Sequence, residues 1–175
     1  MVASKETWSR LRHFKIGSGD NWGDPKLIDD RLLLRLDDFR EWLGVPIHVL
    51  EGVKVGGHTK RSYHYRENGA CAVDVIIPNY MGWPFDLVLD AMRFGFTGIG
   101  YYPDWTWGGD IVGGLHLDMR PLKWDRDLSR NYKKSRWMGV KDEHGKQRYV
   151  ALNFENMVKY AHNGEPWEGF NVVKG

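Results

Sequence analysis

The sequence predicts a single α+β domain, in which a mostly antiparallel sheet carries helices on one face. Two segments with helical periodicity alternate with short apolar runs that are typical of strands. The last two of these runs are joined by a loop rather than by a helix, which favours antiparallel pairing. With 175 residues the chain is long enough to bury one core, and we find no linker or internal repeat that would divide it.

The two predicted helices span about residues 25–43 and 84–94. In each of them apolar side chains recur every three or four residues, and a glycine follows the last turn, Gly44 or Gly95. Pro25 suits the first turn of the first helix, with Asp24 as its N-cap.

The apolar runs predict strands at 46–51, 70–77, 98–102 and 115–119. The C-terminal part adds a weak strand near 148–152 and a short helix near 154–161. We expect residues 1–24 to be irregular.

Composition and charge exclude several classes of function. Hydrophobic residues make up 42% and charged residues 27%, which is typical of a soluble globular protein. The net charge of +2 is mild and the basic residues are scattered, so we expect no nucleic-acid partner. No apolar run is long enough to span a membrane, and the N-terminus lacks the apolar segment of a signal peptide. We therefore expect a protein made in the cytoplasm, with a single Cys71 that cannot form an intramolecular disulfide.

Three residues suggest a metal site. Asp74 is a carboxylate in the middle of an apolar strand, where burial is costly unless the group is paired or bound to a metal. His116 and Asp118 lie on the same face of another predicted strand, and His64 precedes Asp74 across a turn. Two imidazoles and one carboxylate leave one tetrahedral position open, which is the ligand set of a hydrolytic zinc site.

The ordered motifs around these residues resemble the zinc D-Ala-D-Ala carboxypeptidases and the phage endolysin L-Ala-D-Glu peptidases, relatives of the hedgehog signalling domain. The resemblance covers about residues 25–125, which leaves residues 126–175 as a C-terminal extension of the single domain 1–175. Its parts are an opening helix and strand, a Gly-rich segment ending in Ser-x-His, a small-residue run ending in Asp, a Gly-Ile-Gly-x-Tyr segment and a His-x-Asp-x-Arg-Pro segment. They lie at 32–51, 57–64, 69–75, 98–103 and 115–121.

The resemblance implies a hedgehog-like fold with one zinc ion held by His64, Asp74 and His116. It also implies that the substrate is the stem peptide of bacterial peptidoglycan. A role in the cell wall or in a phage particle would follow, and the sequence does not predict the oligomeric state. The nine residues between His64 and Asp74 exceed the usual spacing, which we interpret as an insertion in the turn around 66–68.

The general base is the second departure from the family. Many members have an acid three residues before the last histidine, where this chain has Gly113. Asp118 and Asp110 are the candidate bases, and Asp118 has the alternative role of orienting a histidine. Arg61, Lys60 and Arg120 are candidates for binding the carboxylate of the substrate.

Two other functions remain open from the sequence. One is a non-catalytic metal-binding or structural module of the same fold, which the missing acid at Gly113 favours. The other is an iron(II) oxygenase, because His116-x-Asp118 with a later histidine, His144 or His162, resembles a two-histidine, one-carboxylate triad. That enzyme would need a strand-rich barrel, and the two predicted helices argue against it.

Overall fold

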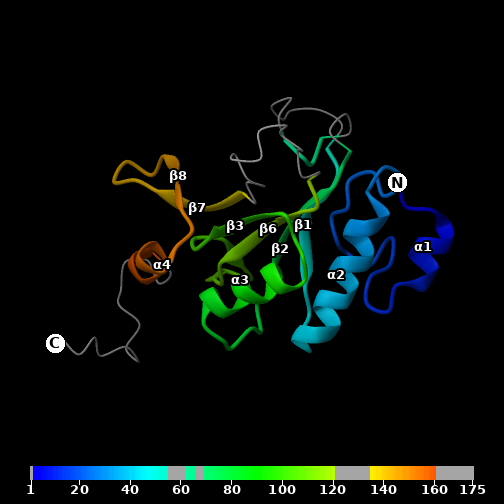
Figure 1. The fold of residues 1–175 in the computed structure, drawn as a ribbon, viewed down its shortest axis with the longest axis horizontal. Helices are drawn as coiled ribbons and strands as arrows, with labels where there is room; N and C mark the ends of the chain where they lie inside the picture. Colours follow the sequence, from blue (N-terminus) through cyan, green and yellow to red (C-terminus); the bar gives the residue numbers. More distant parts are fainter. Residues whose placement is uncertain (1, 55–61, 66–68, 121–134, 161–175) are drawn as a thin grey trace, which may run out of the picture.

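A computed structural model describes residues 2–54, 62–65, 69–120 and 135–160. It confirms the α+β class: four helices accompany a six-stranded sheet with the strand order β1-β2-β6-β3-β7-β8 in this described part (Figure 1). All neighbouring strands of this sheet are antiparallel except β3 and β7, which are parallel. A two-stranded hairpin, β4 and β5, forms a separate small sheet.

In chain order, the helices and strands are α1 (Lys5–Arg10), α2 (Asp30–Leu43), β1 (His48–Glu51), β2 (Ala72–Ile76), α3 (Pro84–Arg93), β3 (Gly98–Tyr102), β4 (Thr106–Trp107), β5 (Asp110–Ile111), β6 (Gly114–Asp118), β7 (Ser135–Lys141), β8 (Gln147–Ala151) and α4 (Phe154–Tyr160). None of the helices in the described ranges is long and apolar enough to cross a lipid bilayer.

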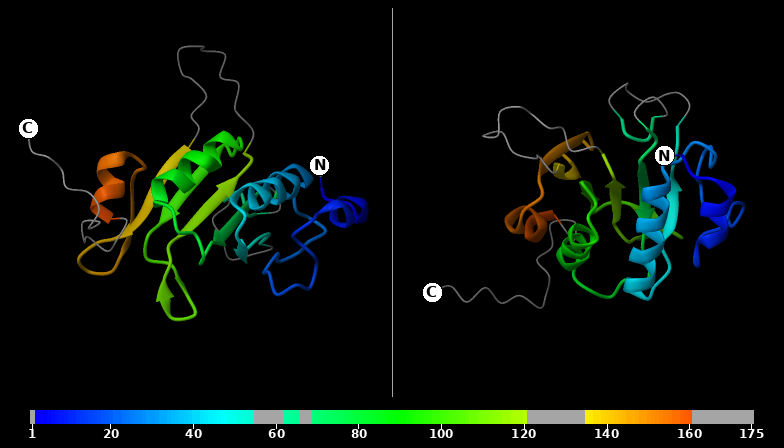
Figure 2. Two further views of the ribbon diagram at one scale, coloured as in Figure 1. Left: turned by 90° about the horizontal axis from the view of Figure 1, so that it is seen from below. Right: turned by 45° about the vertical axis from the view of Figure 1, so that its right-hand side comes forward.

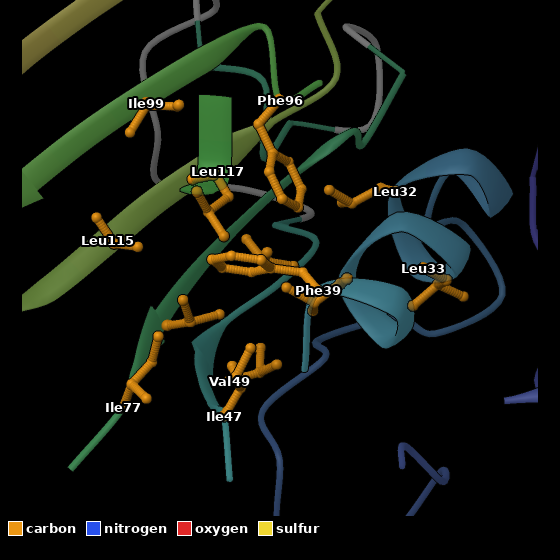
Figure 3. Close-up of a cluster of buried hydrophobic side chains, with 14 of the residues drawn as sticks. Leu32, Leu33, Phe39, Ile47, Val49, Ile77, Phe96, Ile99, Leu115 and Leu117 are labelled. Carbon is orange, nitrogen blue, oxygen red and sulfur yellow. The ribbon is translucent and has the colours of Figure 1, made fainter. Parts of the chain in front are cut away.

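Helices α2 and α3 pack on the same face of the sheet, as Figures 1 and 2 show. Alternate strand residues point toward them, because successive side chains of a strand lie on opposite faces. The buried cluster between the layers includes Phe39 from α2, Leu115 and Leu117 from β6, and Ile99 from β3 (Figure 3). The strand residues that alternate with these buried ones therefore face the other side of the sheet.

The predicted helices and strands agree with the structure, including β8 and α4, except near the N-terminus, at the β4–β5 hairpin, where the sequence predicts a loop, and at β7. Helix α2 begins at Asp30 rather than near residue 25, because Asp29 is its N-cap and accepts a hydrogen bond from the Arg31 amide at 2.9 Å. The Asp29 amide also donates to the Ala70 carbonyl at 3.1 Å, which holds this segment beside the start of β2. Within residues 1–24, predicted to be irregular, α1 forms behind the N-cap Ser4.

Strand β7 was not predicted, and it extends the sheet. It pairs with β3 on one side and with β8 on the other, so the C-terminal extension is part of the same sheet as the predicted core.

Candidate metal centre

The face of the sheet opposite α2 and α3 carries polar and aromatic side chains in register. Cross-strand partners form two adjacent rows: Ala72, Asp118, Gly98 and Ser135; then Asp74, His116, Gly100 and Trp137. A third row consists of the pairs Gly114–Tyr102 and Gly139–Tyr149, with the Tyr102 ring over Gly139. The registers place a small residue next to each large one. The middle row contains two of the three predicted metal ligands.

The glycines of these rows make room for the large side chains. A Cβ atom on Gly98 would lie 2.1 Å from an Asp118 carboxylate oxygen, and one on Gly100 would lie 2.5 Å from the Trp137 ring. A Cβ atom on Gly139 would lie 2.2 Å from the Tyr102 ring. Because real side chains do not approach so closely, glycine at these positions lets a carboxylate and two rings lie across the sheet.

Three ligand atoms converge at the middle row, as predicted from the sequence. His116 Nδ1 lies 2.9 Å from Asp74 Oδ1 and 3.1 Å from His64 Nε2, and His64 Nε2 lies 3.3 Å from Asp74 Oδ1. Both histidines are buried, and Asp74 is partly exposed. The spacing of His64 from Asp74 in sequence therefore does not prevent it from joining the site.

The outer nitrogen of each histidine has a fixed acceptor. His64 Nδ1 lies 2.8 Å from the Gly52 carbonyl oxygen, and His116 Nε2 lies 3.0 Å from Asp118 Oδ2. These acceptors place a proton on the outer nitrogens, so the inner nitrogens, His64 Nε2 and His116 Nδ1, carry lone pairs when the rings are neutral. Two lone pairs and a carboxylate oxygen then face one another, which requires a cation between them.

The geometry fits a tetrahedral metal ion. Ligand atoms about 2.0–2.1 Å from zinc at tetrahedral angles stand about 3.3 Å apart. The three separations of 2.9, 3.1 and 3.3 Å are close to this value. The outer hydrogen bonds to Gly52 and Asp118 are the carbonyl and carboxylate contacts that typically orient histidine ligands. The residues thus could hold a metal ion.

The electrostatics of the site favour a bound cation. Burial would raise the pKa of Asp74, but hydrogen bonds from His116 and His64 outweigh it and hold the pKa far below its usual range. Burial would lower the pKa of His116, but hydrogen bonds to Asp118 and Asp74 raise it to about 9. Without a metal, a proton on His116 therefore supplies the positive charge between the carboxylates.

Asp118, one of the two candidate bases, lies behind the site. Its side chain is fully buried, and its Oδ2 accepts from His116 Nε2. The Arg120 guanidinium and the Arg120 amide also donate to this carboxylate, at 2.8 to 3.0 Å for the Nε and backbone contacts. Burial would raise the Asp118 pKa, but these partners hold it far below its usual range. This geometry favours the alternative role, in which Asp118 orients His116.

The structure places the other candidate base and the candidate substrate-binding residues differently. Asp110 is exposed on the β4–β5 hairpin and is not among the residues that line the pocket at the triad. Arg120 lines that pocket and stacks on the rings of Tyr63 and Trp137, with its guanidinium carbon 4.4 and 5.4 Å from the ring centroids. Arg61 and Lys60 lie outside the described residues.

The pocket in front of the triad has a volume of about 430 Å³. Besides the three ligands and Arg120, it is lined by Ser62 and Tyr102, which belong to the Ser-x-His and Gly-Ile-Gly-x-Tyr segments. The sequence analysis did not single out its other lining residues: Tyr63, Ser135, Trp137 and Tyr149. Among the described residues, Asp74 supplies the only carboxylate of this lining. Gly113, where the family has its acid, instead abuts the Tyr101 hydroxyl, which lines a different cavity.

The open sheet also bears on the iron(II) oxygenase alternative. Asp118 does not converge with His64, Asp74 and His116, and the candidate His144 is exposed near the turn between β7 and β8. His162 lies outside the described residues.

Comparisons with known proteins do not assign the chain to a family. No protein-family model matches it, and no curated protein is similar enough to count as a match.

Proposed function

We propose that this protein is a zinc peptidase that hydrolyses a peptide bond in the stem peptides of bacterial peptidoglycan. The observation that carries the proposal is the convergence of His64 Nε2, Asp74 Oδ1 and His116 Nδ1 beside an open pocket. A set of two imidazoles and one carboxylate leaves one tetrahedral position for water or substrate, as in zinc hydrolases.

Zinc would supply Lewis acidity and would lower the pKa of a bound water toward neutral. The residues of the chain hold and orient the site. Asp118 and the Gly52 carbonyl keep the two histidines in the tautomers that expose their inner nitrogens. Arg120 neutralises the buried Asp118 and presents a cationic edge to the pocket, stacked between Tyr63 and Trp137.

The substrate class rests on the ordered motifs that resemble zinc D-Ala-D-Ala carboxypeptidases and endolysin peptidases. The aromatic and polar lining of the pocket is compatible with a short peptide. The site of action, in the cell wall or in a phage particle, rests on the same resemblance.

A non-catalytic metal-binding module is the second candidate. The observation that favours it is the pocket lining, since the described residues that line the pocket include no acid other than Asp74 that could take a proton from water. Such a module would bind the ion through the same triad and leave peptides intact.

Metal content and cleavage, measured together, test both candidates. We expect about one zinc per chain in the purified protein, and its loss in His64→Ala, Asp74→Ala and His116→Ala. His144→Ala is the matched control, because this histidine is exposed and lies outside the triad. Muropeptide cleavage that a chelator abolishes and zinc restores would support the peptidase, whereas zinc binding without cleavage would favour the module. A wild-type protein that binds no zinc would refute both.

A further inference from the structure

The C-terminal strands β7 and β8 contribute to the pocket beside the triad. Tyr149 on β8 is the direct cross-strand partner of Gly139 on β7, and the Tyr102 ring lies over Gly139. Both tyrosines line the pocket that the three candidate ligands share. The two phenol side chains are thus neighbours in a row next to the row of His116 and Trp137.

Hydrogen bonding orients the hydroxyl groups of these side chains. Trp137 Nε1 donates to the Tyr102 hydroxyl oxygen at 3.2 Å, so the Tyr102 proton is directed to another acceptor. Tyr102 is held in place by Trp105, which stacks on its ring at 4.4 Å between centroids. Burial raises the Tyr102 pKa, and the charge of Asp74 and the neighbouring Tyr149 hydroxyl add to this, which outweighs the lowering by the Trp137 hydrogen bond, so this phenol stays protonated and can donate. Hydrogen bonds in such a series polarise one another, so the last hydroxyl becomes a stronger hydrogen-bond donor.

We infer that Tyr149 is a substrate-binding residue, whose hydroxyl is the outer end of the donor series Trp137, Tyr102 and Tyr149 and donates to an anionic oxygen of the ligand at the metal site. The inference rests on the proposed function and extends it to the C-terminal extension. Tyr149 suits this role because it lines the pocket at the triad and the residue is 66% exposed. A donor aimed at developing negative charge stabilises the tetrahedral species of peptide hydrolysis more than the planar substrate.

The test is ligand binding to the zinc-loaded full-length protein. The first probe is a phosphinate analogue of an alanyl-alanine dipeptide, whose two phosphinyl oxygens are anionic and tetrahedrally placed. The second is a thiol dipeptide, which binds zinc through sulfur and presents no oxyanion at the metal; its C-terminal carboxylate is common to both probes. Because a hydrogen bond to a charged group is lost, Tyr149→Phe should weaken the phosphinate about 10- to 100-fold and leave thiol binding within about twofold.

Tyr80→Phe is the control, since Tyr80 lines a cavity bounded by helix α3, away from the triad. It should change binding of neither probe. Equal phosphinate affinity in Tyr149→Phe and wild type, or equal weakening of both probes, would overturn the inference while the peptidase proposal stands. A zinc-loaded wild type that neither binds the phosphinate nor cleaves dipeptides would overturn both.

Discussion

Replacing Asp118 by Asn tests whether this buried carboxylate orients the metal site. The substitution keeps the shape of the side chain and removes its charge. Asp118 Oδ2 accepts from His116 Nε2 at 3.0 Å and from Arg120 Nε at 2.9 Å, and Oδ1 accepts from Arg120 Nε at 2.8 Å. An amide has one acceptor oxygen where the carboxylate has two, so its NH₂ group must face a donor of either His116 or Arg120.

The expected loss follows from these contacts. Removing a carboxylate that orients a histidine ligand typically weakens metal binding about 10- to 100-fold, which corresponds to about 1.4–2.8 kcal/mol. The fold should also lose stability, because breaking a buried ion pair by removing one partner costs about 3–5 kcal/mol, and Asn retains part of the contacts. Asp118→Asn should therefore bind zinc more weakly and melt at a lower temperature.

Competition with a chromophoric zinc chelator at pH 7.5 measures the affinity, and circular dichroism checks that the variant is folded. Asp110→Asn is the matched control, because Asp110 is exposed on β5 and should leave the zinc affinity unchanged. If Asp118→Asn binds zinc as tightly as the wild type and loses only peptide cleavage, Asp118 acts as the general base and the orienting role is refuted.

Four further predictions concern the His116 proton, the metal ion and the sheet. Zinc must displace the proton of His116, whose pKa is raised to about 9, so at pH 7.5 binding should release about one proton; calorimetry in two buffers of different ionisation enthalpy that gives none would contradict this. Because the folded pKa is raised from 6.5, His116 should stabilise the metal-free protein fully below pH 6.5 and lose this effect as the pH rises to about 9, which urea titrations at several pH values would measure. Zinc at 100 times its Kd should stabilise the fold by about 2.7 kcal/mol, seen as a rise in Tm that a chelator reverses; an unchanged Tm would mean that the folded state does not bind zinc preferentially. Gly100→Ala places a Cβ 2.5 Å from the Trp137 ring and should cost about 1–3 kcal/mol in the free energy of unfolding, whereas unaltered stability would show that the ring can move freely.

The sequence predicts most of the sheet and all three candidate ligands, and of these Asp74 and His116 follow from local alternation alone. In β2 and β6 every second residue is apolar and buried, so Asp74 and His116 must share the opposite face. The pairing of Asp74 with His116 is thus an almost direct consequence of the two strand patterns, once β2 and β6 are neighbours.

The position of His64 and the wall of the pocket could not be predicted in the same way. His64 lies outside the regular strands, and long-range contacts place it: its own carbonyl accepts from the Lys54 amide at 2.9 Å, and its ring meets the Gly52 carbonyl. Strand β7 has only a weak alternation and pairs with β3 across a long stretch of chain, so local patterns do not reveal it. Trp137 and Tyr149 therefore reach the site through pairing that only the three-dimensional structure shows.

The same register fixes both the core and the candidate metal site, which links stability to function. Asp74 is opposite His116 because Val73 is opposite Leu117 and Val75 is opposite Leu115, with these apolar pairs facing the helices. A shift of one residue between β2 and β6 would turn the two valines toward the pocket and bury Asp74 among apolar side chains. Burial of the core thus selects the register that brings Asp74 to His116, and the cost of gathering two histidines and a carboxylate is offset by a cation. A proton on His116 fills this role in the metal-free protein, and the same three ligand atoms could hold a metal ion in its place.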